Sequence, residues 1–230
     1  MDKILLVEDD TMIAAGIVND LSEYGCYAIL TVSTVQQALA AATVPFDAIL
    51  LDIMLPDGNG MKLCSQLNQM QRCPIIFISC LDDSSTIIEA LGCGGDDYVC
   101  KPFDNGVLHA RIQANLRRVK MEQGHVMQKK LECERFSLDS DTHILTIDGQ
   151  EIFLISMEFR ILAFLMQNVG KYFKSRELYA QIWGQDSQGD VRTVQVHIHN
   201  LRKKMGDDYA EPRYIKNVRG KGYTFDPPKN

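Results

Sequence analysis

The chain has 230 residues, of which 46% are hydrophobic and 23% are charged, enough for two ordinary globular domains that each bury a core. No apolar stretch approaches the roughly 18 residues of a membrane span, and the acidic N-terminus is unlike a signal peptide. We therefore expect a cytoplasmic protein with no membrane contact. The seven cysteines form no CxxC pair, which argues against a disulfide framework and a zinc site. A redox-sensing thiol stays open as a minor alternative.

Charge is distributed unevenly. Residues 1–118 carry 7 basic side chains against 15 acidic ones, whereas residues 192–221 carry 8 basic against 3 acidic. An acidic first half fits metal or phosphoryl chemistry, and a basic patch near the end fits an anionic polymer.

The first half alternates between apolar runs and helical patterns. Five runs predict strands: Ile4–Val7, Tyr27–Val32, Ala48–Leu51, Ile75–Ile78 and Tyr98–Cys100. Between them, apolar residues recur at helical spacing, as in Ile13, Ile17 and Leu21. Repeated βα units predict a doubly wound, five-stranded parallel sheet with helices on both faces.

The pattern changes after residue 118. Residues 119–130 have weak periodicity and are expected to form a linker between a domain at 1–118 and a domain at 131–230. In the second domain, short alternating segments up to Leu154 predict antiparallel strands. Three helices follow, for which Ser156 and Ser175 are candidate caps of the first two, and a glycine-rich turn at Gly220–Gly222 predicts a closing β-hairpin.

Polar residues stand at the ends of four predicted strands. Asp52 follows the third strand, Glu8 and Asp9 follow the first, and Ser79 and Lys101 follow the fourth and fifth. This edge of a parallel sheet is where ligands bind. Clustered carboxylates repel one another, so they favour a cation, and hard oxygen ligands favour Mg²⁺. Lys101 and Ser79 can meet an anion on Asp52, which together suits formation of an aspartyl phosphate.

With Met54-Leu55-Pro56 and Asp96-Asp97-Tyr98, these residues resemble the receiver domain of bacterial two-component response regulators. The resemblance covers residues 1–118 and implies a flavodoxin-like fold. It makes Asp52 the phosphoacceptor, and it implies a Mg²⁺ site formed by Glu8, Asp9, Asp52 and the Met54 backbone. It also implies phosphoryl contacts and a switch by Ser79, Lys101 and the aromatic Tyr98, which turns inward when Ser79 moves to the phosphoryl group.

Two positions bear on how long a phosphoryl group would last. In receivers, the residues two after the phosphoacceptor and two after the hydroxyl residue flank the hydrolytic water. Here they are Met54 and Leu81, which are apolar and cannot orient water. We expect slow self-dephosphorylation.

A basic helix is predicted from about residue 191 to Met205. At 100° per residue, Val194, Ile198, Leu201 and Met205 share a buried face. The opposite face carries Arg192, Val196, His199 and Lys203. Such a helix fits the DNA major groove, and the basic turn with Arg219 and Lys221 fits a minor groove.

This half resembles the winged-helix effector domain of the OmpR/PhoB family, through Trp183-Gly184, Arg192-Thr193-Val194 and Val218-Arg219-Gly220. The resemblance implies phosphate contacts by Trp183, Arg192, Thr193 and Arg202. It implies base contacts by Val196, His199 and Asn200, with Lys203, Arg219 and Lys221 completing the interface. Because Asn can pair with adenine, we expect a preference for A·T steps.

The family's phosphorylated receivers pair through salt bridges. The resemblance implies that Asp96 pairs with Arg111 and Asp97 with Arg118, while Ile87 and Val107 replace a third, charged pair. Because an apolar contact is not screened by salt, we expect a dimer that is less salt-sensitive than usual, and one that could already form without phosphate.

The sequence thus predicts a phosphorylation-dependent transcriptional regulator that is not an enzyme. Its implied partners are a sensor histidine kinase, promoter DNA, a second copy of the chain when active, and RNA polymerase. Two alternatives stay open. One is a Mg²⁺-dependent phosphatase, disfavoured because Met54 stands where such enzymes place a second Asp. The other is a regulator driven by thiol oxidation or by a ligand.

Overall fold

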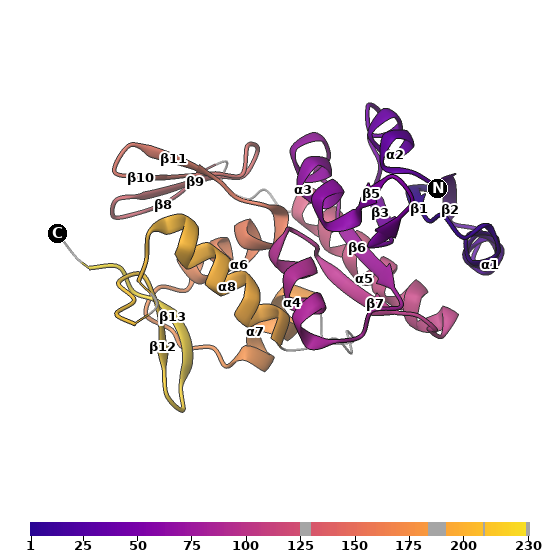
Figure 1. Cartoon of the computed structure of the whole chain (residues 1–230). Coiled ribbons are helices and arrows are strands. Elements are labelled where there is room, and N and C mark those ends of the chain that lie inside the picture. The colour runs from indigo at the N-terminus through magenta and orange to yellow at the C-terminus, as the bar shows by residue number, and fades with distance from the viewer. Residues whose placement is uncertain (125–129, 184–191, 209, 229–230) are drawn as a thin grey trace. The chain divides into compact units, whose positions relative to one another are not determined.

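The computed structural model describes residues 1–124, 130–183, 192–208 and 210–228. Expectations that fall on the remaining residues lie outside this description, as do those on the side chains of Arg118 and Arg192. The chain divides into two compact units, Met1–Val119 and Lys120–Asn230, which are described separately (Figure 1).

The first unit contains a five-stranded parallel sheet. Its strands lie in the order β2-β1-β3-β6-β7, with bounds β1 Asp2–Val7, β2 Tyr27–Val32, β3 Ala48–Leu51, β6 Ile75–Ser79 and β7 Asp97–Cys100. Every residue of β3 and β6 is buried, because both strands are covered on two faces. The predicted doubly wound sheet is therefore confirmed.

Five helices connect these strands. They are α1 Thr11–Ser22, α2 Val35–Ala41, α3 Gly60–Met70, α4 Ser84–Gly92 and α5 Asn105–Gly124. Apolar residues of α1 and α5, among them Ile17 and Ile112, pack with Ile4 and Ile76 in one core cluster on one sheet face. A two-stranded hairpin, β4 Met54–Leu55 and β5 Gly58–Asn59, precedes α3. Because α5 extends to Gly124, the first part of the expected linker is helical.

The second unit begins with an antiparallel sheet in the order β11-β10-β9-β8. Its strands are β8 Lys130–Cys133, β9 Phe136–Asp139, β10 Ile144–Ile147 and β11 Gln150–Phe153. Three helices follow, α6 Ser156–Gln167, α7 Ser175–Trp183 and α8 Arg192–Met205, and then the hairpin β12 Ile215–Val218 with β13 Gly222–Phe225. One core cluster joins sheet, helices and hairpin, so this unit is the predicted winged-helix domain.

The two predicted serine caps are wrong. Helix α6 begins at Ser156, and its first turn is closed by Glu158, whose Oε2 accepts from the Ile155 N–H at 3.1 Å. Helix α7 begins at Ser175 in the same way, with Glu177 Oε2 accepting from Lys174 N–H at 2.8 Å. In both helices the glutamate accepts from the N–H of the residue that precedes the helix, which is the glutamate half of a capping box.

Within the described residues, none of the helices combines the length and the apolar character needed to cross a membrane.

Candidate phosphoacceptor site and nucleic-acid interface

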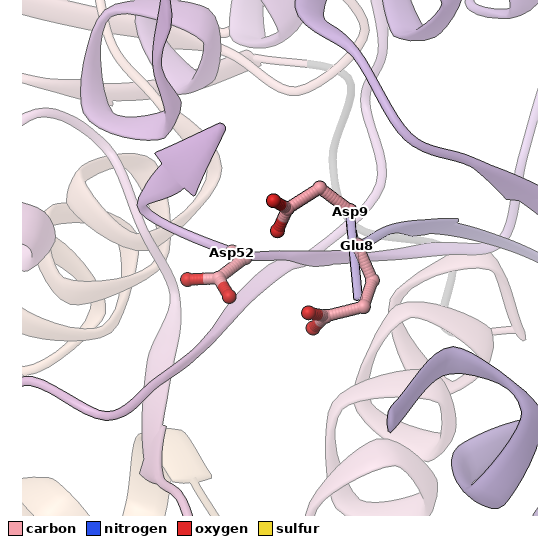
Figure 2. Close-up of side chains that lie close together, drawn as sticks. All are labelled: Glu8, Asp9 and Asp52. Atoms are coloured by element: carbon pink, nitrogen blue, oxygen red, sulfur yellow. The ribbon is translucent and has the colours of Figure 1, made fainter. Parts of the chain in front are cut away.

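Asp52 lies directly after β3, beside the end of β1. Its backbone N–H donates to the Val7 carbonyl at 3.0 Å, which continues the parallel ladder one residue beyond the strand. Glu8 and Asp9 follow β1 and bring their carboxylates toward that of Asp52 (Figure 2). One oxygen from each residue lies within 4.8 Å of the others. The two strand ends therefore assemble the three predicted carboxylates.

Lys101 links two of these carboxylates. Its Nζ lies 2.6 Å from Asp52 Oδ2 and 2.6 Å from Glu8 Oε2. The residue follows β7, its N–H donates to the Ser79 carbonyl at 2.8 Å, and its bond to Pro102 is cis. Burial alone would lower the pKa of Lys101, but the hydrogen bonds and negative charges of Asp52 and Glu8 raise it above its usual value. Lys101 is thus a permanent positive charge at Asp52.

Glu8 is the most deeply buried of the three acids, with 2% of its surface exposed. Burial raises the pKa of its carboxyl, and the Lys101 ammonium only partly opposes that effect. Asp9, by contrast, is exposed. Two buried carboxylates and one exposed carboxylate within 4.8 Å form a donor set that suits Mg²⁺, which binds through few carboxylates and keeps several waters. Met54 N–H donates to Asp52 Oδ1 at 3.2 Å, and the expected role of the Met54 carbonyl stays a prediction.

Gly60 supports the backbone of this site and was missed from the sequence. A Cβ built on Gly60 would lie 2.0 Å from the Asp52 carbonyl oxygen and 2.9 Å from Ile53 Cα. Its N–H also donates to the Ile53 carbonyl at 2.8 Å. Only glycine fits this approach. The sequence from Asp57 to Gly60 indicates a tight turn, but nothing in it indicates that Gly60 contacts Asp52.

Ser79 and Tyr98 both form hydrogen bonds with the backbone of Leu81. Ser79 is 1% exposed, and its Oγ accepts from Leu81 N–H at 3.5 Å. The Tyr98 ring lies inward, and its hydroxyl donates to the Leu81 carbonyl at 2.6 Å. Burial raises the pKa of Tyr98 to about 12, so this hydroxyl is a hydrogen-bond donor at neutral pH. The Leu81 carbonyl as an anchor for Tyr98 was not predicted.

Helix α8 presents the expected two faces. Val194, Ile198, Leu201 and Met205 are at most 6% exposed, as predicted. On the outer side, His199 and Lys203 are exposed, and Val196 and Asn200 are half-buried. The contacts of these outer side chains with base edges and phosphates stay predictions.

The position of Arg202 differs from the phosphate contact that the sequence predicts. Its guanidinium is buried and donates to the Ile215 carbonyl of β12, from Nε at 2.9 Å and from the terminal nitrogen Nη2 at 2.6 Å. Arg202 therefore holds the wing hairpin to α8 and does not point toward a phosphate. Trp183 and Thr193 are also almost fully buried, at 2% and 5% exposed, so their phosphate contacts stay predictions.

The wing carries two exposed basic residues. Arg219 and Lys221 flank Gly220, which has a φ of 80° that favours glycine, and Lys221 Nζ lies 5.1 Å from the centre of the Tyr172 ring. Gly222 packs against Phe173, whose carbonyl would lie 2.2 Å from an added Cβ. The hairpin is thus pinned at its base while its basic turn is exposed.

Two residues of the expected dimer face are paired within one chain. Arg111 Nη1 lies 2.7 Å from Asp97 Oδ1, and the pairing of Arg111 with Asp96 of a second chain stays a prediction. Asp96 is 2% exposed, and its Oδ2 accepts from Ile75 N–H at 2.8 Å, so it joins two strands. Of the apolar positions, Val107 is 44% exposed and Ile87 is half-buried.

Comparison with known proteins follows the same division of the chain. Residues 4–113 match the response regulator receiver domain, and residues 149–225 match the C-terminal domain of transcriptional regulatory proteins. A parallel sheet with an acidic edge followed by a winged helix defines a two-component response regulator. The chain belongs to the OmpR/PhoB family of these regulators.

Relatives extend over the whole chain. It is 35% identical over 97% of its length to the uncharacterised transcriptional regulatory protein YrkP of Bacillus subtilis, with 97% of that protein covered. It is 39% identical over 78% of its length to the phosphate regulon regulator PhoB of Rhizobium meliloti, with 79% covered. A solved structure of a RitR mutant matches with a TM-score of 0.83 at 27% identity, covering 99% of this chain and 100% of that one.

Proposed function

We propose that this protein accepts a phosphoryl group on Asp52 from a sensor histidine kinase, dimerises through its receiver and regulates transcription from promoter DNA in the cytoplasm. One observation carries the proposal. Asp52 Oδ2 lies 2.6 Å from Lys101 Nζ, in a pocket where the carboxylates of Glu8 and Asp9 are close enough to share a metal ion.

The chemistry is a transfer from nitrogen to oxygen. A carboxylate oxygen of Asp52 attacks phosphorus, and the bond from phosphorus to one ring nitrogen of the kinase histidine breaks. A proton on the other ring nitrogen lets the histidine leave as neutral imidazole. Mg²⁺, held by Glu8, Asp9 and Asp52, would neutralise charge on the phosphoryl oxygens. Lys101 supplies a second positive charge beside the reacting oxygen, and the Ser79 hydroxyl supplies a donor.

The signal travels from Asp52 through Ser79 to Tyr98. A phosphoryl group adds about −1.5 to −2 of charge and three strong acceptors. Ser79 Oγ currently accepts from Leu81 N–H, and Leu81 accepts from Tyr98. Tyr98 already lies inward without a phosphoryl group, so the expected inward turn is not the step that we propose. When Ser79 turns to the phosphoryl group, the Leu81 N–H loses its acceptor, and the segment that anchors Tyr98 shifts. The surface of α4, β7 and α5 then changes.

The test compares the full chain with Asp52→Asn. We expect beryllofluoride with Mg²⁺, which mimics the aspartyl phosphate, to increase DNA affinity of the unmodified protein and to leave Asp52→Asn unchanged. Fragments for this test come from selection on random and genomic DNA with and without beryllofluoride. Equal affinity in all four cases would exclude phosphorylation as the signal and favour a regulator that responds to a thiol or a ligand.

A further inference from the structure

Two of the seven cysteines are brought together by the receiver fold. Cys64 lies in the middle of α3 and is 0% exposed, whereas Cys93 follows α4 and is partly exposed. They are 29 positions apart in sequence, with no spacing that marks them as a pair. The fold alone makes them neighbours.

Two hydrogen bonds hold the turn after α4 against α3. Ser65 Oγ donates to the Cys93 carbonyl at 3.2 Å. Asn68 Nδ2 lies 3.5 Å from Cys64 Sγ and donates to the Gly94 carbonyl at 3.1 Å. Cys93 Sγ donates to the Ala90 carbonyl at 3.0 Å, and the two thiols are close enough to influence each other's pKa. These contacts place the turn that carries Cys93 beside the face of α3 that carries Cys64.

The two thiols differ in chemical character. The hydrogen bond from the Cys64 thiol lowers the pKa of Cys93 below 9.0, despite partial burial. The same contact, together with burial, raises the pKa of Cys64. The thiolate is the nucleophile in thiol chemistry. Cys93 is also the more exposed of the two thiols, whereas Cys64 is fully buried, so a dissolved oxidant reaches Cys93 first. Cys93 is therefore the attacking thiol, and Cys64 is the thiol that resolves the product.

We propose that Cys64 and Cys93 form a reversible disulfide when the protein meets a peroxide. The Cys93 thiolate attacks one peroxide oxygen, the O–O bond breaks, and Cys93 becomes a sulfenic acid while the second oxygen leaves as hydroxide and takes a proton. Cys64 sulfur then attacks Cys93 sulfur, and the S–O bond breaks to release water. In total, two thiols lose two electrons and two protons, and hydrogen peroxide becomes two waters.

The bond would join the middle of α3 to the end of α4, next to the segment that enters β7. Gly95 leaves no space there, since an added Cβ would lie 2.6 Å from the Phe77 ring. The modification site is thus within the receiver, and its formation requires neither a kinase nor phosphate. Failure of this proposal would leave the proposed function untouched.

The experiment treats the full chain with hydrogen peroxide, alkylates the remaining thiols, and digests with trypsin, Glu-C and Asp-N. Cleavage at Lys62, Arg72, Glu89 and Asp96 places Cys64 in peptide 63–72 and Cys93 in peptide 90–95, each with a single cysteine. We expect these two peptides to be linked by a disulfide that dithiothreitol reverses. The matched control Cys73→Ser, which removes a buried thiol outside the pair, should keep the link.

Cys64→Ser should lose the link and leave Cys93 as a trappable sulfenic acid. Since that variant could fold poorly, a measurement on the unmodified protein stands beside it. Native alkylation of Cys93 should be faster than that of Cys73 at pH 8, because burial raises the pKa of Cys73. A link between other cysteines, oxidation of Cys93 with Cys64 left as a thiol, or slower alkylation of Cys93 than of Cys73 would overturn the proposal.

Discussion

At the scale of single residues, the phosphoacceptor site depends on one close approach of backbone. Gly60 lies against the Asp52 carbonyl, at a distance that no side chain tolerates. This contact fixes where the chain turns after Asp52, and thereby where the Asp52 carboxylate meets Lys101. Gly60, which has no side chain, thus positions the reacting carboxylate of Asp52.

We expect Gly60→Ala to lower the free energy of unfolding by more than about 2 kcal/mol, because backbone must shift to make room. Its beryllofluoride response should weaken as well. The control is Gly16→Ala in α1, where an added Cβ meets nothing within 4 Å; it should raise stability by roughly 0.5–1 kcal/mol. Urea unfolding of both variants measures the difference. Equal effects would show that the contact with Asp52 has no energetic consequence.

A second residue-scale prediction concerns the lifetime of the aspartyl phosphate. Met54 is 64% exposed beside Asp52, and Leu81 lies two residues after Ser79. Neither side chain can orient a hydrolytic water, so we expect phosphate loss over many minutes. Met54→Asn with Leu81→Glu should accelerate that loss, measured as release of phosphate after phosphorylation by acetyl phosphate. Because Leu81 anchors Tyr98 through its backbone, the variant should keep its response to beryllofluoride. An unchanged rate would contradict the expectation.

At the scale of elements, neighbouring basic residues of α8 have opposite roles. Arg202 is buried against β12, while Lys203 is exposed. Arg202→Met should cost about 1–3 kcal/mol, because the Ile215 carbonyl loses its donor. Lys203→Met should change stability by less than about 0.5 kcal/mol but weaken DNA binding and reduce its salt slope by about one unit.

Thermal unfolding and salt-dependent binding titrations separate these two roles. The Arg202 variant, measured below its unfolding temperature, should keep the salt slope of the unmodified protein. A reduced slope for Arg202→Met would mean that Arg202 contacts phosphate after all.

An ion pair between two helices predicts a pH dependence. Glu158 in α6 is 1% exposed, and its Oε2 lies 2.6 Å from Lys204 Nζ in α8. Burial raises the pKa of Glu158, and Lys204 does not fully offset it. The folded protein therefore binds this proton more tightly than the unfolded chain does. This contribution to stability is full below the ordinary value of 4.5 and is lost as pH rises through the folded pKa.

The matching variant is Glu158→Gln, which cannot titrate. The stability of the unmodified protein relative to Glu158→Gln should fall as pH rises from about 4 toward 7. Urea unfolding across this range measures the difference. A difference that grows with pH would mean that Lys204 dominates over burial.

At the scale of the whole molecule, two chains are expected to meet through the receiver. Val107 is 44% exposed and Ile87 is half-buried, while Arg111 is already paired with Asp97 inside one chain. We therefore expect apolar contact to hold more of the dimer than intermolecular ion pairs do. Because salt screens exposed charges and not apolar contact, the beryllofluoride-bound dimer should persist from about 50 to 500 mM salt.

Sedimentation across that salt series measures the dimer with and without beryllofluoride. Val107→Ser is the matched variant and should weaken the dimer at every salt concentration. Dissociation of the unmodified dimer at high salt would show that intermolecular ion pairs hold it together. A strict monomer without beryllofluoride at all salts would limit dimerisation to the activated form.

Much of the fold was predictable because its signals are local. Four consecutive apolar residues predict the buried strand Ala48–Leu51, and apolar spacing at 100° per residue predicts helix α8. The caps of α6 and α7 were not predictable in the same way. Each serine is the first residue of its helix and not the residue before it, a difference of one position that local sequence does not decide.

The sequence by itself determined the chemistry of this protein: which acids, hydroxyl and lysine stand at the ends of strands, and which basic residues lie on the last helix. Periodicity and strand order are enough for that, since parallel strands end at one edge. Only the tertiary structure decided the partners. It turned Arg202 inward to β12, bound Asp96 to Ile75 and brought Cys64 to Cys93. Each of these contacts joins different elements, and their packing sets which polar atoms are within reach.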